Sequence, residues 1–202
     1  MRLIPNLLIN NSYLTKNVSF KKYKYLGDPV NAAKIYFEKG ADEILLMDNS
    51  AYKNGINLKL IDQITSNCFI PITYAGNVKD IEDIKKLLNS GVERIAVGVY
   101  QPKDWDRIIE FTNFLGRSGI CPILNLRWQK FFKDYYLYDY KFKRCRFRYK
   151  LERLLDDINN VKTGEIIIFD TKMEGTRKGF SLSKFRNKIS SKTSLIAAGG
   201  IK

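Results

Sequence analysis

The apolar residues of this chain follow two patterns that alternate along its length. Four windows carry apolar residues at helical spacing: 29–39, 58–66, 80–88 and 105–115. Four short segments are mainly apolar and too short for helices: 41–48, 70–74, 92–98 and 121–126. Gly40 and Gly91 follow two of the helical windows, as a helix cap does. Strands that alternate with helices predict βαβ units and a parallel sheet.

The chain also contains an internal repeat. Residues 40–48 resemble residues 164–170, and residues 70–79 resemble residues 193–202. Both pairs lie about 122 positions apart, which predicts two copies of one structural half. Two halves of four units make an eight-stranded α/β barrel. The second copy stops early, so we expect a (β/α)8 TIM-type barrel truncated after strand 7, as one domain over 1–202.

Four charged residues of alternating sign each precede an apolar run: Arg2, Glu43, Arg94 and Glu165. The N-terminal ends of parallel strands meet at one end of a barrel, so we expect a ring of ion pairs there. Desolvating a charge costs several kcal/mol unless it is well paired. Such a ring indicates that a small polar molecule passes or is sensed there. Alternatively, each charge only caps the solvent end of its strand.

Composition limits the chemistry that the chain can perform. The 202 residues are 45% hydrophobic, which suffices for one sizeable core, and the net charge of +14 favours anionic partners. There is no histidine, and the three cysteines have no metal-ligand spacing, so we expect no metal and no cofactor. Neither a signal-peptide pattern nor a membrane-length apolar run is present. We therefore expect a cytoplasmic protein without membrane partners.

An insert at 127–150, between the fifth and sixth strands, alternates aromatic with basic residues. Between residues 136 and 149 the apolar positions fall into two phases: Tyr136, Tyr138, Tyr140 and Phe142 in one, and Cys145 with the aromatic Phe147 and Tyr149 in the other. The phase changes at Lys143-Arg144, which predicts the turn of a β-hairpin. Two interpretations remain open. The hairpin is a lid whose aromatic face packs down, or its aromatic and basic side chains, which include Lys141 and Arg146, bind RNA.

Active sites of such barrels lie at the C-terminal ends of the strands. The residues expected there include Leu8, Asp48, Asn125 and Asp170, with the loop 172–180. Small residues that expose backbone N–H groups suit phosphate, and they are Gly76, Gly98, Gly175, Thr176, Gly199 and Gly200. One set in each half predicts a ligand with phosphate at both ends, and Lys16 could reach it. Alternatively, the glycines form tight turns and Lys16 is a surface lysine.

Several motifs together resemble one known family: Arg2-Leu3-Ile4-Pro5, Gly27-Asp28-Pro29, Gly40-Ala41-Asp42-Glu43, Glu174-Gly175-Thr176 and Ala198-Gly199-Gly200. The chain resembles the cyclase subunit of imidazole glycerol phosphate synthase, the HisF family, along its whole length. The resemblance implies a barrel that receives ammonia from a glutaminase subunit (HisH-like) docked at its N-terminal face. It also implies that the four alternating charges form the ammonia gate, with Arg94 in place of a lysine.

The departures from the family pattern bear on catalysis. The resemblance places two catalytic aspartates where this chain has Leu8 and Asn125, and neither can act as a carboxylate base. Glu174 stands at a third acid position, and Asp48 is retained. Ordinary cyclase chemistry is therefore not expected.

Segments 4–8 and 24–32 resemble a diverged branch that accompanies acetamidino-sugar modification of bacterial surface glycans. This implies that the chain, with its glutaminase, supplies ammonia to a separate sugar amidotransferase. Two alternatives stay open: an authentic cyclase subunit of histidine biosynthesis, and a non-catalytic RNA-binding protein.

Overall fold

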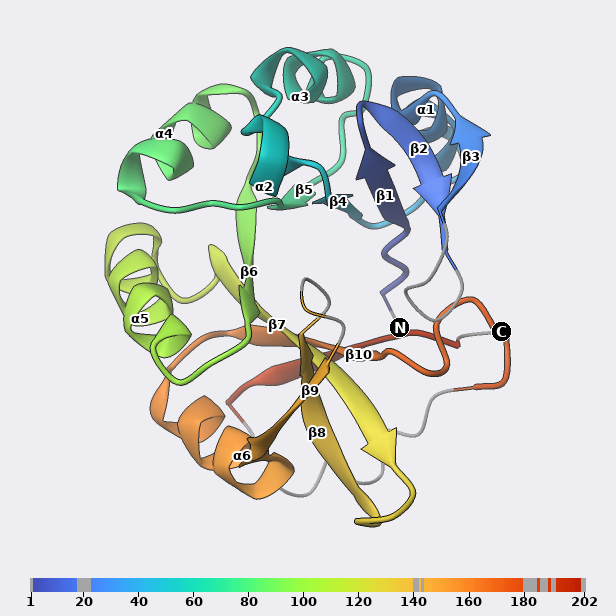
Figure 1. Cartoon of the computed structure of the whole chain (residues 1–202). Helices are drawn as coiled ribbons and strands as arrows, with labels where there is room; N and C mark the ends of the chain where they lie inside the picture. Colours follow the sequence, from blue (N-terminus) through green and yellow to red (C-terminus); the bar gives the residue numbers. More distant parts are fainter. Residues whose placement is uncertain are drawn as a thin grey trace. The chain divides into compact units, whose positions relative to one another are not determined.

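The computed structural model describes residues 2–17, 23–139, 142, 144–179, 185, 189 and 192–200. The chain forms two compact units, which are considered in turn below. Unit 1 comprises Met1–Lys16 and Tyr23–Val97, and unit 2 comprises Asn17–Lys22 and Gly98–Lys202. Each unit consists of strands flanked by helices (Figure 1). None of the helices in the described parts of the chain is long and apolar enough to span a membrane.

Within the described residues, unit 1 contains four helices. Its elements are β1 (Asn6–Asn10), β2 (Tyr13–Lys16), β3 (Lys24–Gly27), α1 (Pro29–Glu38), β4 (Ile44–Asp48), α2 (Ala51–Asn54), α3 (Leu58–Thr65), β5 (Ile72–Ala75), α4 (Ile81–Asn89) and most of β6 (Arg94–Val99). Strands β1, β4, β5 and β6 pair in parallel in that order. Strands β2 and β3 extend this sheet in antiparallel fashion beyond β1.

Local sequence signals fix the helix ends of unit 1. Asp28 accepts hydrogen bonds from the backbone N–H groups of Val30 and Asn31, and Pro29 occupies the first turn of α1. Asp80 caps α4 in the same way, through the N–H group of Asp83. Gly40 takes the left-handed conformation (φ 76°) that ends α1 and turns the chain toward β4.

Unit 2 combines a parallel core with an antiparallel extension. Its elements are α5 (Asp104–Leu115), β7 (Ile120–Gln129), β8 (Asp134–Asp139), β9 (Arg144–Lys150), α6 (Leu151–Asn160), β10 (Glu165–Asp170) and β11 (Ser194–Ala198). Strand β10 lies between β7 and β11 and pairs with both in parallel. The second half of β7 instead pairs antiparallel with β8, which pairs with β9. Helix α6 packs on β8 and β9.

The α/β fold of the (β/α)8 barrel type is confirmed. The described residues contain seven parallel strands, four in unit 1 and three in unit 2, as the internal repeat predicts. One expectation about the first strand is wrong. Strand β1 begins at Asn6, so Arg2 does not open it directly, and Leu8 lies in the middle of β1 rather than at its end.

Candidate functional site

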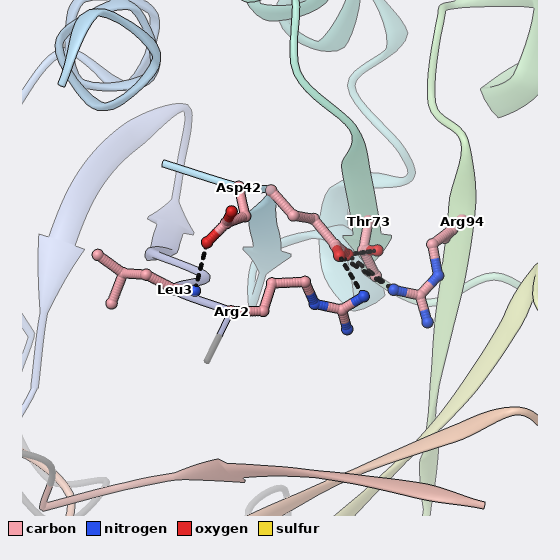
Figure 2. A network of polar contacts seen from close by, with 6 residues as sticks. Arg2, Leu3, Asp42, Thr73 and Arg94 are labelled. Atoms are coloured by element: carbon pink, nitrogen blue, oxygen red, sulfur yellow. Dashed lines mark hydrogen bonds and ion pairs between the residues drawn. The ribbon is translucent and has the colours of Figure 1, made fainter. Parts of the chain in front are cut away.

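A buried carboxylate organises the N-terminal ends of the strands in unit 1. The Glu43 side chain is only 5% exposed, and Arg94 Nη1 donates to both of its oxygens, at 3.0 and 3.1 Å. Thr73 Oγ1 donates a further hydrogen bond to Glu43 Oε1. Arg2 Nη1 lies 3.8 Å from Glu43 Oε2 (Figure 2). Three of the four predicted gate residues therefore form one connected network around a single carboxylate.

Strand register explains why these side chains meet. Leu45 pairs with Thr73, and Thr73 pairs with Arg94, so the three residues lie on the same face of the sheet. Glu43 precedes Leu45 by two positions and shares that face.

Arg2 reaches the network although it lies outside β1. The Leu3 N–H donates to Asp42 Oδ2 at 2.7 Å (Figure 2). The Asp42 N–H donates in return to the Leu3 carbonyl. The segment before β1 is thus held along the start of β4, which presents Arg2 to Glu43. The fourth predicted gate residue, Glu165, is the first residue of β10, in unit 2.

Two aspartates at strand ends perform the same local task, one in each unit. Asp48 Oδ1 at the end of β4 accepts from the N–H groups of Ser50 and Ala51, at 2.8 and 3.1 Å. Asp170 Oδ1 at the end of β10 accepts from those of Lys172 and Met173, at 3.0 and 3.3 Å. Both carboxylates therefore fix the turn that follows their strand.

Asp170 has a second partner from the antiparallel extension. The Tyr135 hydroxyl on β8 donates to Asp170 Oδ2 at 3.1 Å, and both residues are buried. Burial, together with the neighbouring Asp170 carboxylate, raises the pKa of the Tyr135 phenol. The tyrosine therefore stays protonated and keeps donating, which ties β8 to the end of β10.

The positions that the resemblance assigns to catalytic aspartates carry no acid. Leu8 is partly buried in β1 and pairs with Met47 of β4. Asn125 is buried near the C-terminal end of the parallel part of β7, opposite Phe169 of β10. Its Oδ1 accepts no hydrogen bond from any residue that the structure describes. Glu174, the third acid position, is partly buried, and this burial raises the pKa of its carboxyl group.

The loop after β10 packs closely on the glycines after β11. The Gly179 N–H donates to the Gly200 carbonyl at 2.7 Å. A Cβ atom on Gly199 would come within 2.7 Å of the Asp170 carbonyl oxygen, and one on Gly200 within 2.7 Å of the Gly179 carbonyl oxygen. Only glycine fits these two positions, because both also have positive φ. Gly175 and Thr176 lie in this loop, where the Thr176 hydroxyl donates to the Met173 carbonyl.

The other predicted phosphate-binding residues have local partners of a different kind. Gly76 and Gly98 each lie against a tyrosine two positions away, since an added Cβ would come within 2.3 Å of the Tyr74 hydroxyl or 2.5 Å of the Tyr100 hydroxyl. Lys16 is exposed at the end of β2 and pairs in register with Lys24 of β3. Two lysines opposite each other repel unless an anion lies between them.

Three tyrosines of the insert are buried within unit 2. Tyr136 and Tyr138 are buried on one face of β8, and Tyr135 is buried on the other. Stacking of bases on exposed rings is therefore not available to these three residues. Tyr140, Lys141 and Lys143 lie outside the described residues, as does Phe180.

Sequence reasoning missed one polar residue of β7. Arg127 donates through Nε to Thr171 Oγ1 at 3.1 Å, and its guanidinium lies 3.8 Å from the centre of the Tyr138 ring. The available signal was its position two residues after Asn125, on the same strand face.

Metal ions require particular groupings of side chains. Among the residues that the structure describes, no three His, Cys, Asp or Glu side chains are grouped so that they could hold a metal ion.

Parallel strands joined by helices, with polar residues at both strand ends, define an α/β protein of the barrel type. The chain belongs to the histidine biosynthesis protein family, because the family model with that description matches residues 2–202. This confirms the resemblance at the level of the family.

Individual relatives support the same family assignment. The chain is 31% identical over 202 residues to a Pseudomonas aeruginosa protein named "Putative imidazole glycerol phosphate synthase subunit hisF2", covering 98% of this chain and 80% of the relative. It is 32% identical to the "Putative imidazole glycerol phosphate synthase subunit hisF3" of Vibrio vulnificus, and the match covers 98% of this chain and 77% of the relative. It is 29% identical to the "Imidazole glycerol phosphate synthase subunit HisF" of Staphylococcus saprophyticus, covering 90% and 73%.

Proposed function

We propose that this chain is the barrel subunit of a glutamine-dependent amidotransferase complex. It receives ammonia from a glutaminase subunit at the N-terminal ends of its strands. It does not carry out the cyclase reaction itself. The ammonia serves a separate amidotransferase that acts on a sugar destined for a surface glycan.

The network around Glu43 is the observation that carries this proposal. A carboxylate that is 5% exposed and bonded to Arg94, Arg2 and Thr73 is costly to build at the end of a strand. A role in admitting a small polar molecule accounts for that cost, whereas a simple solvent cap does not need burial. Ammonia is small, polar and able to hydrogen-bond with these groups.

Exposed apolar side chains at the same end of unit 1 support the docking of a partner. Leu3, which is 62% exposed, precedes β1, and Phe69, which is 77% exposed, precedes β5. The Phe69 ring packs edge-on against Phe37 near the end of α1, with ring centres 5.7 Å apart. Together with the exposed part of Arg2, these residues form a surface that suits a protein partner with apolar and acidic groups.

The residues at the two positions that the resemblance assigns to catalytic aspartates support the loss of cyclase activity. Leu8 cannot transfer a proton, and Asn125 offers an amide in place of a carboxylate. Glycines 199 and 200, the loop with Gly175 and Thr176, and the Lys16–Lys24 pair remain suited to a phosphorylated or nucleotide ligand.

The test uses the chain together with a glutaminase subunit from the same organism. We expect the two proteins to co-purify and the chain to accelerate glutamine hydrolysis. We also expect no turnover of the family's ribulosyl nucleotide substrate, even with excess ammonium salt. Turnover within about tenfold of an ordinary cyclase would overturn the loss of cyclase activity. A chain that neither binds nor stimulates the glutaminase would overturn the ammonia-receiving role.

The alternative that the relatives' names support is an authentic cyclase subunit. All three are named as imidazole glycerol phosphate synthase subunits, the first two with the word "Putative". The same assay decides between the two. The RNA-binding alternative is less favoured because Tyr135, Tyr136 and Tyr138 of the insert are buried.

A further inference from the structure

An arginine near the C-terminal strand ends of unit 2 has a fixed side chain whose terminal nitrogens are available to bind an anion. Arg127 is fixed at two points: its Nε donates to the buried Thr171 hydroxyl, and its guanidinium stacks on Tyr138. Its terminal nitrogens, Nη1 and Nη2, make no hydrogen bond or ion pair with any residue that the structure describes. A guanidinium anchored in this way presents two parallel donors at low entropic cost, which matches the paired oxygens of a carboxylate or phosphate.

A second, independent observation lies on the same strand face. Asn125 precedes Arg127 by two residues, so their Cα atoms are about 7 Å apart and their side chains lie on one face. The Asn125 side chain is 2% exposed, and its Oδ1 accepts no hydrogen bond from the described residues. A buried amide oxygen that accepts no hydrogen bond is unfavourable. We therefore expect a hydroxyl or N–H group from a bound molecule to donate to Asn125 Oδ1.

Cys145 on β9 lies beside this arginine. It pairs in register with Tyr138, the residue on which the Arg127 guanidinium stacks. Its thiol is partly exposed and accepts a hydrogen bond from Gln129 Nε2 at 2.8 Å. Burial raises the pKa of the Cys145 thiol, and the charges of Arg127 and Lys172 act in the opposite direction. A ligand bound at Arg127 would thus lie near a thiol that can report on it.

We propose that Arg127 and Asn125 form a subsite for a hydroxylated organic anion. The ligand's carboxylate or phosphate pairs with the terminal nitrogens of Arg127. One of its hydroxyl or N–H groups donates to Asn125 Oδ1. The inference rests on the proposed function, in which this chain does not carry out the cyclase reaction. It specifies the class of ligand that the C-terminal strand ends of unit 2 bind instead. An asparagine suits this task better than an aspartate, since a carboxylate at position 125 would repel the anion.

The experiment follows the alkylation of Cys145 by iodoacetamide in the purified full chain, measured by peptide mass spectrometry. Cys68 and Cys121 are buried and serve as internal references. Three probes are compared: glucuronate, glucose 1-phosphate and neutral glucose. We expect one or both anions to slow alkylation in a saturable way and glucose to have no effect. The anion with the lower midpoint identifies the group that Arg127 prefers.

Matched variants decide whether the subsite is responsible. Arg127→Met and Asn125→Asp should each raise the protection midpoint by about tenfold or more, the first by removing the donors and the second by repulsion. Arg117→Met removes an exposed arginine near the opposite end of β7 and should match the wild type. If urea unfolding shows that Arg127→Met does not fold, the protection midpoint of Asn125→Asp alone decides whether the subsite binds the anion.

Three results would overturn the subsite: equal protection by glucose, no protection by either anion, or an unchanged midpoint in the folded variants. None of them bears on the proposed function, because stimulation of the glutaminase by this chain is measured separately and without the probes.

Discussion

Arg94 and Glu43 form a two-oxygen ion pair in which one guanidinium nitrogen lies 3.0 and 3.1 Å from the two carboxylate oxygens. Both side chains are largely withdrawn from water, at 14% and 5% exposed. Solvent screens such a pair only weakly. The attraction between the two charges therefore has to offset the free-energy cost of removing each of them from water. An arginine in this position also holds the carboxylate more rigidly than a lysine would, since its donors lie in one plane.

Removing the Glu43 charge should therefore destabilise unit 1. We expect Glu43→Gln to lower the free energy of unfolding by about 2–4 kcal/mol, since Arg94 loses a buried counter-charge. Urea denaturation measures the change. Glu82→Gln is the matched control, because Glu82 and Lys85 form an exposed pair at 3.9 Å that is worth at most about 0.5 kcal/mol. Equal effects of the two substitutions would show that the Glu43 network is not stabilising.

The contact between Tyr135 and Asp170 gives a second prediction. Tyr135→Phe removes a buried hydrogen bond to a carboxylate, so we expect a loss of about 1.5–3 kcal/mol in the free energy of unfolding. Tyr25→Phe, at an exposed position of β3, should change stability by less than about 0.5 kcal/mol. Thermal and urea unfolding of the two variants can be compared directly. A Tyr135→Phe variant as stable as Tyr25→Phe would mean that β8 is held by apolar packing alone.

Much of the parallel core could be predicted from the sequence, because its signals are local. Helix α1 begins after Asp28 and ends before Gly40, as capping and backbone conformation require. The internal repeat also has a physical basis in the structure, since Asp48 and Asp170 occupy matching strand ends and make matching hydrogen bonds.

Other elements could not be predicted because long-range contacts define them. Strands β2 and β3 are short and have no clear apolar pattern. Strand β2 is held by pairing with β1, and β3 is held by pairing with β2. The anchoring of Arg127 depends on Thr171, which lies 44 residues away in the chain. Hydrogen bonds at such separation leave no local signature, so the site around Arg127 emerged only from the structure.

Glu174 predicts a pH dependence. Burial raises the pKa of its carboxyl group in the folded chain, so between the ordinary glutamate pKa and this raised value the folded state binds more protons than the unfolded state. Stability from this group is therefore present at low pH and falls as the pH rises through that window. We expect Glu174→Gln to reduce this fall and to be more stable than the wild type at neutral pH. Urea midpoints measured across the acidic range test this, and identical slopes for the two proteins would contradict it.

The two absent aspartates can be restored together. If the remaining site is intact, Leu8→Asp combined with Asn125→Asp should raise any residual turnover of the ribulosyl nucleotide substrate with ammonium salt, because both proton-transfer groups return. Each single variant should gain little, since the two groups act as a unit. A double variant that folds but remains inactive would show that further residues of the site have changed. The circular dichroism spectrum and unfolding midpoint of each variant serve as folding controls.

The exposed phenylalanine before β5 provides the sharpest test of partner docking. Phe69 is 77% exposed and contacts Phe37, so Phe69→Ser should leave the stability of the isolated chain within about 0.5 kcal/mol of the wild type. If the glutaminase covers this surface, the substitution should weaken binding by about tenfold or more, as expected for an aromatic side chain at the centre of an interface. Phe131→Ser is the matched control, because Phe131 is 88% exposed in the turn after β7, beyond the C-terminal strand ends. Surface plasmon resonance with the immobilised glutaminase distinguishes the two, and equal affinities of both variants would place the glutaminase elsewhere on the chain.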